Sequence, residues 1–425
     1  MAIPDVRGAS LYSVTTRPER VLLTTTIIML PLEAHIPPVG GFSSLYFVFI
    51  VLAGYVLVNR GEMFDRIWMH PVFLPGYAFI GITFVLELTS PFPLYESPLR
   101  FGLMIAGAIL VASLCRDRLA LQACVFGCLG AALWLAVVLF LTSFGALHSA
   151  ATTDFREASK VRAEVFSNKA VGGNINHMSF TCVQGGVAAF ALTLADNSPF
   201  RRKLFGAIAV FCLSGSFLTM SRATIAVTSL SCAAILYVCG FKRGKTFLVA
   251  GVLGATILLI LPNAIWSRMA FQTEQGNREA RAWLYVTAVE QLPEYVIAGV
   301  GAGNFGKQWG WEHGFGGGDV VYSLHNMFLQ VMVFWGLLGL IPFVALMWQA
   351  YRYFPKGCGR DVLSLSLLGI AVSQLAMMPF YSDIYSKGLS LALGMIVGSC
   401  CWIWPRGIVQ PIEPSFRQVA HSHLS

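Results

Sequence analysis

Residues 299–340 read GVGAGNFGKQWGWEHGFGGGDVVYSLHNMFLQVMVFWGLLGL, and the interpretation of the whole chain starts from this stretch. A loop rich in Gly and Trp leads to His325-Asn326, and an unbroken apolar run follows. The run predicts a membrane helix, so a titratable ring and an amide lie at the lipid–water boundary. Gly336 and Gly339 predict a place where a neighbouring helix approaches closely. Because chemistry is often carried by loops on a rigid scaffold, we interpret this corner as a candidate active site.

Composition indicates the class of protein. The chain has 425 residues, of which 56% are hydrophobic and 12% charged, and its mean hydropathy is +0.67. A soluble domain has about 25% charged residues. The sequence therefore predicts an all-α polytopic membrane protein, with residues 1–425 as a single integral-membrane domain. About twelve transmembrane helices are expected, near 21–39, 42–58, 71–88, 99–114, 119–142, 176–195, 204–219, 222–240, 246–262, 324–349, 362–380 and 384–403.

Two connections are long, at 143–175 and at 263–323, and the second joins the ninth and tenth expected helices. This second connection is expected to contain a surface helix that begins near Asn277. Lys and Arg are concentrated in the short connections of the opposite side, so both termini are expected in the cytoplasm and both long loops outside it. The net charge of +8 then indicates anionic membrane lipid rather than nucleic acid as the partner. None of the ten Cys falls in a long loop, and their surroundings predict neither disulfides nor a metal site.

Two arginines lie where a charge is unexpected. Arg222 opens an apolar helix directly after Met220-Ser221, although the helix dipole favours a cation at the other end. It is either a snorkelling side chain or a cation held for an anionic ligand. Arg281 precedes an apolar helical stretch on the same expected face, and Arg278 lies one turn before it, where simple solvation is the alternative. Guanidinium groups bind phosphate oxygens bidentately, so Arg222 and Arg281 suggest a diphosphate site.

The glycines of GVGAGNFG do not form a nucleotide fingerprint. Asn304 stands where the third Gly of that motif would be, and no strand is expected before the loop. The glycines are expected to let the backbone turn tightly beside a ligand.

These motifs resemble those of the bacterial O-antigen ligase/polymerase superfamily. His325-Asn326, nine residues and Gly336-x-x-Gly339-Leu340 resemble its signature, and Thr219-Met220-Ser221-Arg222-Ala223 resembles its Ser-Arg-small motif between adjacent spans. Arg281-x-x-x-Tyr285 followed by Gly299-Val-Gly301 is similar to its Arg-x-x-x-aromatic…Gly-Val-Gly segment, with Tyr where many members have Trp. Asn174-Ile-Asn176-His177 loosely resembles the start of its sixth span. The resemblance covers about residues 165–345.

The resemblance implies a metal-independent, cofactor-free glycosyltransferase of the bacterial inner membrane. Its donor would be a glycan on undecaprenyl diphosphate, and its acceptor at the periplasmic face would be the lipid A–core. Arg222 and Arg281 would hold the diphosphate, and His325 would orient or deprotonate the acceptor hydroxyl. Asn326 and Asn304 could hydrogen-bond sugar, while Trp309, Trp311 and Tyr322 could stack on it or anchor the membrane interface. The further substrate-binding candidates are Ser221, Arg278 and Asn176.

Two alternatives remain open from the sequence. A polymerase of the same superfamily would join lipid-linked repeat units instead of using lipid A–core. A polysaccharide or lipid transporter or flippase would also need about twelve spans. Transporters place ionisable groups near the bilayer midplane and contain repeats or broken helices, whereas the candidates here cluster at one face.

Overall fold

The structure is a computed structural model that describes residues 15–32, 44–144, 175–219, 221–239, 251, 275–317, 320–321, 323–355, 361–381 and 386–403. It is helical throughout these ranges except for one short pair of strands. The first half contains α1 (Arg17–Leu32), α2 (Ser44–Ile67), α3 (Leu74–Thr89), α4 (Glu96–Leu114), α5 (Arg118–Leu139), η2 (Phe140–Phe144), α8 (Ile175–Ala195), α9 (Pro199–Leu218) and α10 (Arg222–Cys239). The second half contains α13 (Gln275–Glu290), α14 (Leu292–Tyr295), α15 (Ala302–Asn304), η4 (Phe305–Trp309), α16 (Gly310–Glu312), β1 (Gly316–Gly317), β2 (Val320–Val321), α17 (Met327–Arg352), α18 (Val362–Met377), η6 (Met378–Phe380), α19 (Lys387–Gly398) and η7 (Ser399–Ile403).

Five helices of the described ranges are long and apolar enough to cross a membrane, and α3, α10 and α19 are shorter apolar helices. This is the architecture of a multi-pass membrane protein. Most of the described helices follow the expected spans: 176–195 corresponds to α8, 204–219 to α9 and 222–240 to α10, whereas α2 continues nine residues beyond the expected 42–58. The expected surface helix of the second long loop is α13. The all-α prediction is confirmed for the described ranges, in which β1 and β2 form one small antiparallel pair. Residues 145–174 of the first long loop and nearly all of the expected span 246–262 lie outside the described residues.

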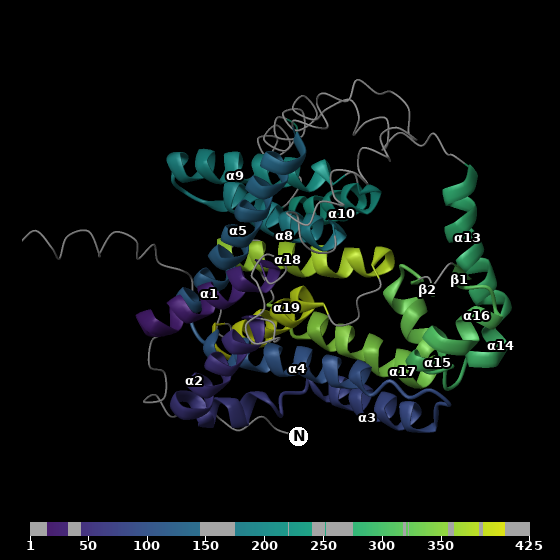
Figure 1. The fold of residues 1–425 in the computed structure, drawn as a ribbon. Helices are drawn as coiled ribbons and strands as arrows, with labels where there is room; N and C mark the ends of the chain where they lie inside the picture. Colours follow the sequence, from purple (N-terminus) through teal and green to yellow (C-terminus); the bar gives the residue numbers. More distant parts are fainter. Residues whose placement is uncertain are drawn as a thin grey trace, which may run out of the picture.

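Helix α8 is the centre of the bundle, and it packs against α5, α9, α10 and α18 (Figure 1). Small residues allow the close contacts. A Cβ added at Gly185 would lie 2.2 Å from the Cβ of Ala132 in α5, and one at Gly186 would lie 2.7 Å from Leu213 in α9. Helices in a membrane associate through such close backbone approach, since lipid provides no hydrophobic driving force between them.

A buried carboxylate in α1 links the first helices of the chain through hydrogen bonds. Glu19 lies in the first turn of α1, ahead of the expected span 21–39, and is fully buried. It accepts hydrogen bonds of 2.7 Å from Arg60 Nε and Arg116 Nη2, which belong to α2 and to the turn before α5. Burial would raise the pKa of Glu19, but these partners and the Thr16 backbone outweigh it and lower the pKa to about 2. The contribution to stability is therefore complete above the ordinary pKa of 4.5 and is lost as the pH falls from there through about 2.

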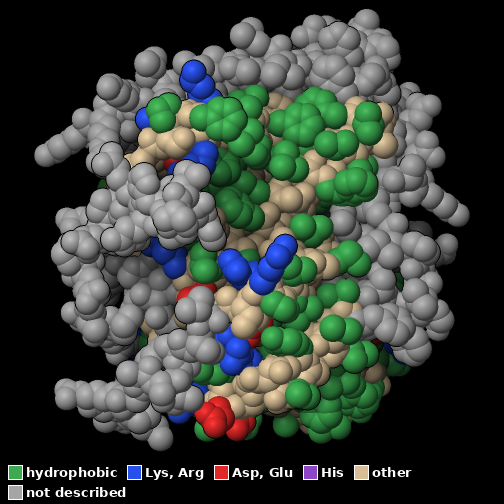
Figure 2. Space-filling view, turned by 90° about the vertical axis from the view of Figure 1, so that its left-hand side faces the viewer, with side chains coloured by type: hydrophobic (Ala, Val, Ile, Leu, Met, Phe, Trp, Pro, Cys, Tyr) green, Lys and Arg blue, Asp and Glu red, His purple; other side chains and the backbone are tan. Residues whose placement is uncertain are grey.

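Basic residues gather at one end of the bundle. They lie at the starts of α1 and α9 and at the ends of α2 and α17, which the antiparallel succession of helices brings to one side. Figure 2 looks at the end of the bundle that faces away from α13–α16 and shows Lys and Arg side chains grouped on it. The helix starts of α8, α10 and α17 lie at the other end.

Helix α17 is broken at Gly336, which has φ 59° and ψ −158°. Segment 296–301 fills the break: two of its N–H groups donate to α17 carbonyls before Gly336, and two of its carbonyls accept N–H groups after it. The bonds run from Val300 N to Val333 O, Gly301 N to Phe334 O, Leu337 N to Val296 O and Leu338 N to Ile297 O, at 2.8–3.1 Å. The interruption therefore leaves these backbone groups satisfied inside the protein, as a membrane requires.

The break corrects the expectation that Gly336 lies against a neighbouring helix. A Cβ at Gly336 would lie 2.2 Å from Ile297 O, and one at Gly299 would lie 2.2 Å from Phe334 O. Gly336 thus admits a loop backbone, not a neighbouring helix. Gly299 makes its turn against α17, and a ligand beside the loop stays a prediction. Gly339 does lie where α3 approaches, since an added Cβ would come within 3.8 Å of Phe79.

We expect Gly336→Ala to destabilise the protein by about 3 kcal/mol or more, because its backbone conformation is one that essentially only Gly adopts and a Cβ would collide with the loop. Thermal unfolding of the purified protein in detergent measures the effect. Gly81→Ala is the matched control: it lies in α3 with no atom within 4 Å of an added Cβ, and is expected to raise stability by about 0.5–1 kcal/mol. Equal midpoints for the two variants would contradict this account of the break.

Candidate functional site

The starts of α8 and α10 are joined by a hydroxyl network. Ser179 Oγ shares a hydrogen bond with Thr224 Oγ1 and donates to Ser216 O at 3.3 Å. Ser221, 8% exposed, lies beside this network, and its carbonyl accepts the Thr224 N–H at 3.1 Å. Asn176 precedes Ser179 by three residues on the same side of α8. The structure therefore brings Asn176, Ser221 and the first residue of α10, Arg222, to one end of the bundle.

The start of α17 lies at the same end. The rings of Phe180, in the second turn of α8, and Tyr381, just after η6, pack edge to face with centroids 5.8 Å apart. Because α18 runs antiparallel to α17, the end of α18 and the start of α17 share one side of the bundle.

Residues 325–326 form a sharp entry into α17. Asn326 is the N-cap, and its Oδ1 accepts the Leu329 N–H at 3.1 Å. The Asn326 amide NH₂ keeps its donors for other partners. Half-buried His325 has φ 49° and is the one non-Gly residue with positive φ in the described part of the chain. Such a conformation costs about 1–2 kcal/mol for most side chains, and it is found preferentially at sites of function.

A second, smaller core holds the long loop against this entry. It contains Leu284, Ala288, Tyr295, Phe305, Trp309, Phe315, Leu324 and Val333. Leu324 adjoins His325, and Leu284 and Ala288 belong to α13, so the core fixes α13 relative to the His325 corner. Figure 1 shows α13–α16 and the strand pair together at this end of the molecule. Arg281 lies one turn before Leu284 in α13; its side chain and that of Arg278 are outside the described residues.

Trp309 belongs to this core rather than to a sugar platform. It is 7% exposed, its Nε1 donates to Glu294 Oε2 at 2.8 Å, and its ring stacks on His313 with centroids 4.2 Å apart. The expectation that Trp309 stacks on sugar or anchors the interface is therefore wrong, because both of its faces are covered by protein. Trp311 is 41% exposed and remains accessible.

Glu87 is a further functional candidate that belongs to none of the motifs described above. It is fully buried in α3 and accepts the Trp335 Nε1–H at 2.9 Å, the Ala302 N–H at 2.7 Å and the Leu94 N–H at 2.8 Å. It thus clamps the Gly-rich loop to α17 directly beside the break. The signal that could have found it is a lone carboxylate within the apolar run of an expected span.

Asn304 follows this clamp in the chain and is half-buried. Its Oδ1 is buried without a hydrogen-bond partner among the described residues. A buried acceptor of this kind favours a donor such as a ligand hydroxyl, because leaving it unsatisfied costs about 1–3 kcal/mol. Tyr322 lies outside the described residues, as does the side chain of Arg222. No group of three or more His, Cys, Asp or Glu suited to a metal ion occurs among the residues the structure describes.

A comparison with protein families matches residues 207–344 to the model of the O-antigen ligase family. The matched stretch runs from α9 to the second half of α17 and includes Arg222, Arg281 and His325. No curated protein sequence matches the chain. Residues 207–344 of this multi-pass membrane protein are thus similar to the O-antigen ligase (Wzy_C) domain.

Proposed function

We propose that the protein is a glycosyltransferase of the O-antigen ligase type, which moves a glycan from undecaprenyl diphosphate to lipid A–core at the periplasmic face of the inner membrane. The observation that carries the proposal is the strained His325 at the entry to α17, inside the stretch that matches the family. That stretch also contains Arg222, at the start of the helix next to α8, and Arg281, on the helix that the second core holds beside His325.

Each candidate side chain has one role in the proposed reaction. The acceptor oxygen attacks the anomeric carbon of the donor glycan and forms the new glycosidic bond, while the bond from that carbon to the diphosphate oxygen breaks. His325 accepts the acceptor's proton, and the two guanidinium groups neutralise the charge that builds on the departing diphosphate. Asn304 Oδ1 and the Asn326 amide supply hydrogen bonds to sugar hydroxyls, with Ser221, Arg278, Tyr322 and Asn176 around them. Glu87 positions the loop without touching substrate.

The sidedness of the proposal rests on charge. The end of the bundle with the grouped Lys and Arg is assigned to the cytoplasm, together with both termini, since short basic connections stay inside. The His325 end then faces the periplasm, where a lipid-linked glycan and lipid A–core meet.

The product identifies the acceptor. We expect the purified protein in lipid vesicles to transfer glycan from a lipid-linked donor onto lipid A–core, seen as a mobility shift of the core lipid in a gel. His325→Ala is the inactive control for the same preparation. A ladder of lengthening lipid-linked chains, formed without lipid A–core, would identify a polymerase instead. Movement of the intact donor across the vesicle membrane without a new glycosidic bond would contradict the proposal and indicate a flippase.

A further inference from the structure

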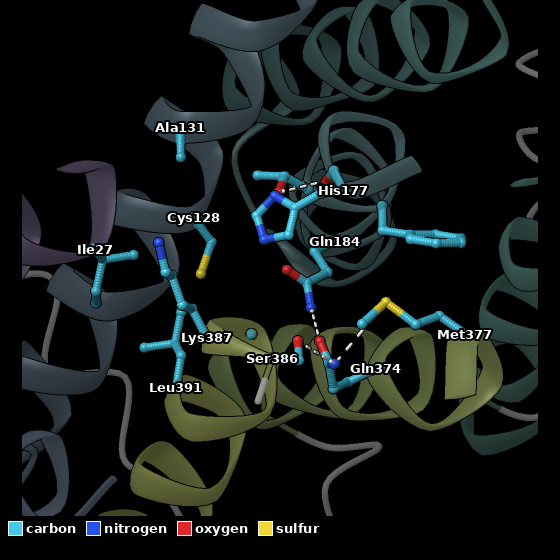
Figure 3. Close-up of a pocket in the computed structure, with 13 residues that line it drawn as sticks. Ile27, Cys128, Ala131, His177, Gln184, Gln374, Met377, Ser386, Lys387 and Leu391 are labelled. Carbon is cyan, nitrogen blue, oxygen red and sulfur yellow. Dashed lines mark hydrogen bonds between the residues drawn. The ribbon is translucent and has the colours of Figure 1, made fainter. Parts of the chain in front are cut away.

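Polar side chains between the central helices satisfy one another. Figure 3 shows a pocket between α8, α18 and the start of α19, where Gln184 Nε2 donates to Gln374 Oε1 and Gln374 Nε2 donates to Ser386 Oγ at 3.0 Å. These bonds link the three helices, as polar side chains between membrane helices commonly do. The pocket therefore belongs to the packing of the bundle. An apolar surface that neither the packing nor the proposed reaction explains lies instead on the second long loop.

Helix α13 is apolar on two sides. One side is buried in the second core described above. The other has an exposed apolar residue at every third position, so that these residues form a stripe along the helix, and two more exposed apolar residues continue the stripe through α14. The five residues are Trp283, Val286, Val289, Leu292 and Ile297, and we call them the α13–α14 face.

The α13–α14 face adjoins the lipid-facing side of α17. Residues 327–335 of α17 are buried or half-buried, whereas Leu337, Leu338 and Ile341 after the break are exposed. Helix α17 is long and apolar enough to cross a membrane, so these exposed side chains face lipid. Ile297 is 67% exposed, and its carbonyl accepts the Leu338 N–H at 3.1 Å. The α13–α14 face is thus continuous with a surface that lipid covers.

Helix α3 marks the edge of the lipid layer at the same level. Its residue Glu87 accepts the Trp335 Nε1–H at 2.9 Å, one residue before the break in α17. Leu88, next to Glu87, is the last exposed large apolar residue of α3. Figure 1 shows α13 at this end of the bundle, where it runs across the direction of α3 and α17. Because α3 and α17 pass through the membrane, a helix that runs across them lies along the membrane plane.

We propose that the α13–α14 face lies on the lipid bilayer at the His325 end of the protein, with its side chains inserted at the boundary between head groups and acyl chains. An interfacial amphipathic helix inserts its apolar side in this way, and Trp283 is of the residue type enriched at that depth. A second copy of the chain would also cover apolar residues, but the bilayer already contacts the adjoining side of α17. The contact fixes α13, and through the second core the His325 corner, relative to the membrane surface.

Photocrosslinking tests the contact in the full-length protein reconstituted in phospholipid vesicles. We expect p-benzoylphenylalanine in place of Val289 to form adducts with phospholipid acyl chains on irradiation, detected by mass spectrometry. The same group in place of Ile341, on the lipid-facing side of α17, is the positive control. In place of the exposed Glu312 of α16, it should lose the lipid adduct. If the variant at Val289 does not fold, Val286 on the same face takes its place.

Hydrogen exchange measures what the contact contributes. Val289→Asp should make the α13 amides exchange about tenfold faster in the vesicles, as expected when the burial of one Val side chain is lost. Val and Asp have similar helix propensities, so the change does not act through intrinsic helicity. Val289→Leu is the matched control, because it keeps the position apolar and should leave the exchange rate unchanged.

Three results would overturn the proposal. The first is a variant at Val289 that forms no more lipid adduct than the variant at Glu312, because the face would then lie in water. The second is crosslinking to another copy of the chain in place of lipid, which would identify an interface between copies. The third is equal exchange of the α13 amides in Val289→Asp and Val289→Leu. None of these measurements requires glycan transfer, so they are independent of a failure of the proposed function.

Discussion

His325→Ala is expected to lower the turnover of glycan transfer by about 100-fold or more, the usual contribution of a general base. Donor binding should change little, since the proposal gives the diphosphate to the arginines. The rate of the native protein should also fall as the solution becomes acidic enough to protonate the imidazole, because a protonated ring cannot accept the acceptor's proton. Single-turnover rates with purified donor and acceptor, recorded across pH, measure both effects.

The backbone of His325 offers a control that separates catalysis from folding. His325→Gly removes the cost of the positive φ and should be at least as stable as the native protein, yet just as inactive as the Ala variant. Partial activity in His325→Gln, without an acid limb in the pH profile, would mean that His325 orients the acceptor by hydrogen bonding. Full activity in His325→Ala would remove the proposed site.

The helices could be predicted from the sequence because crossing a membrane requires long apolar runs, and the helical backbone follows from the absence of water there. Expected span 222–240 became α10 (Arg222–Cys239) and 362–380 became α18 with η6, for this reason. Local structure that depends on contact with a segment far away in the chain could not be predicted in this way. A single Gly336 inside an apolar run is tolerated by a continuous helix, and the segment that opens it, 296–301, lies about forty residues earlier.

For the candidate site, which stays a prediction, the sequence indicates residue types but not the contacts that support them. His325 and Asn326 were found from their position before an apolar run, and the N-cap of Asn326 explains part of that pattern structurally. Glu87 was missed because its partner, the Ala302 N–H, is 215 residues away and carries no side-chain signal. Trp309 was misjudged for a related reason: the small core that covers it is built from segments far apart in the chain, including α13 and α17.

The arginines are expected to give the largest effects of all. Arg222→Ala and Arg281→Ala should each abolish detectable transfer, because each would leave part of the charge on the departing diphosphate uncompensated in a site of low dielectric. Arg→Lys should restore little at either position, since an ammonium cannot reproduce a bidentate contact with phosphate oxygens. Arg222 and Arg281 lie near the starts of α10 and α13, and we expect both helices to stay folded in the variants.

Measurements of ligand binding distinguish this role of the arginines from a purely structural one. Undecaprenyl diphosphate, which lacks the glycan, should bind at least about tenfold more weakly to either Ala variant than to the native protein, as expected for the loss of a charge-assisted hydrogen bond. Arg100→Ala is the matched control: Arg100 lies near the start of α4, and its partner is the exposed Glu96 one turn away. Loss of such an exposed pair costs about 1 kcal/mol or less, so its binding and transfer should be native. Native binding and turnover in both Arg222→Ala and Arg281→Ala would leave these residues as ordinary arginines at the membrane interface, and His325 without the diphosphate that its reaction requires.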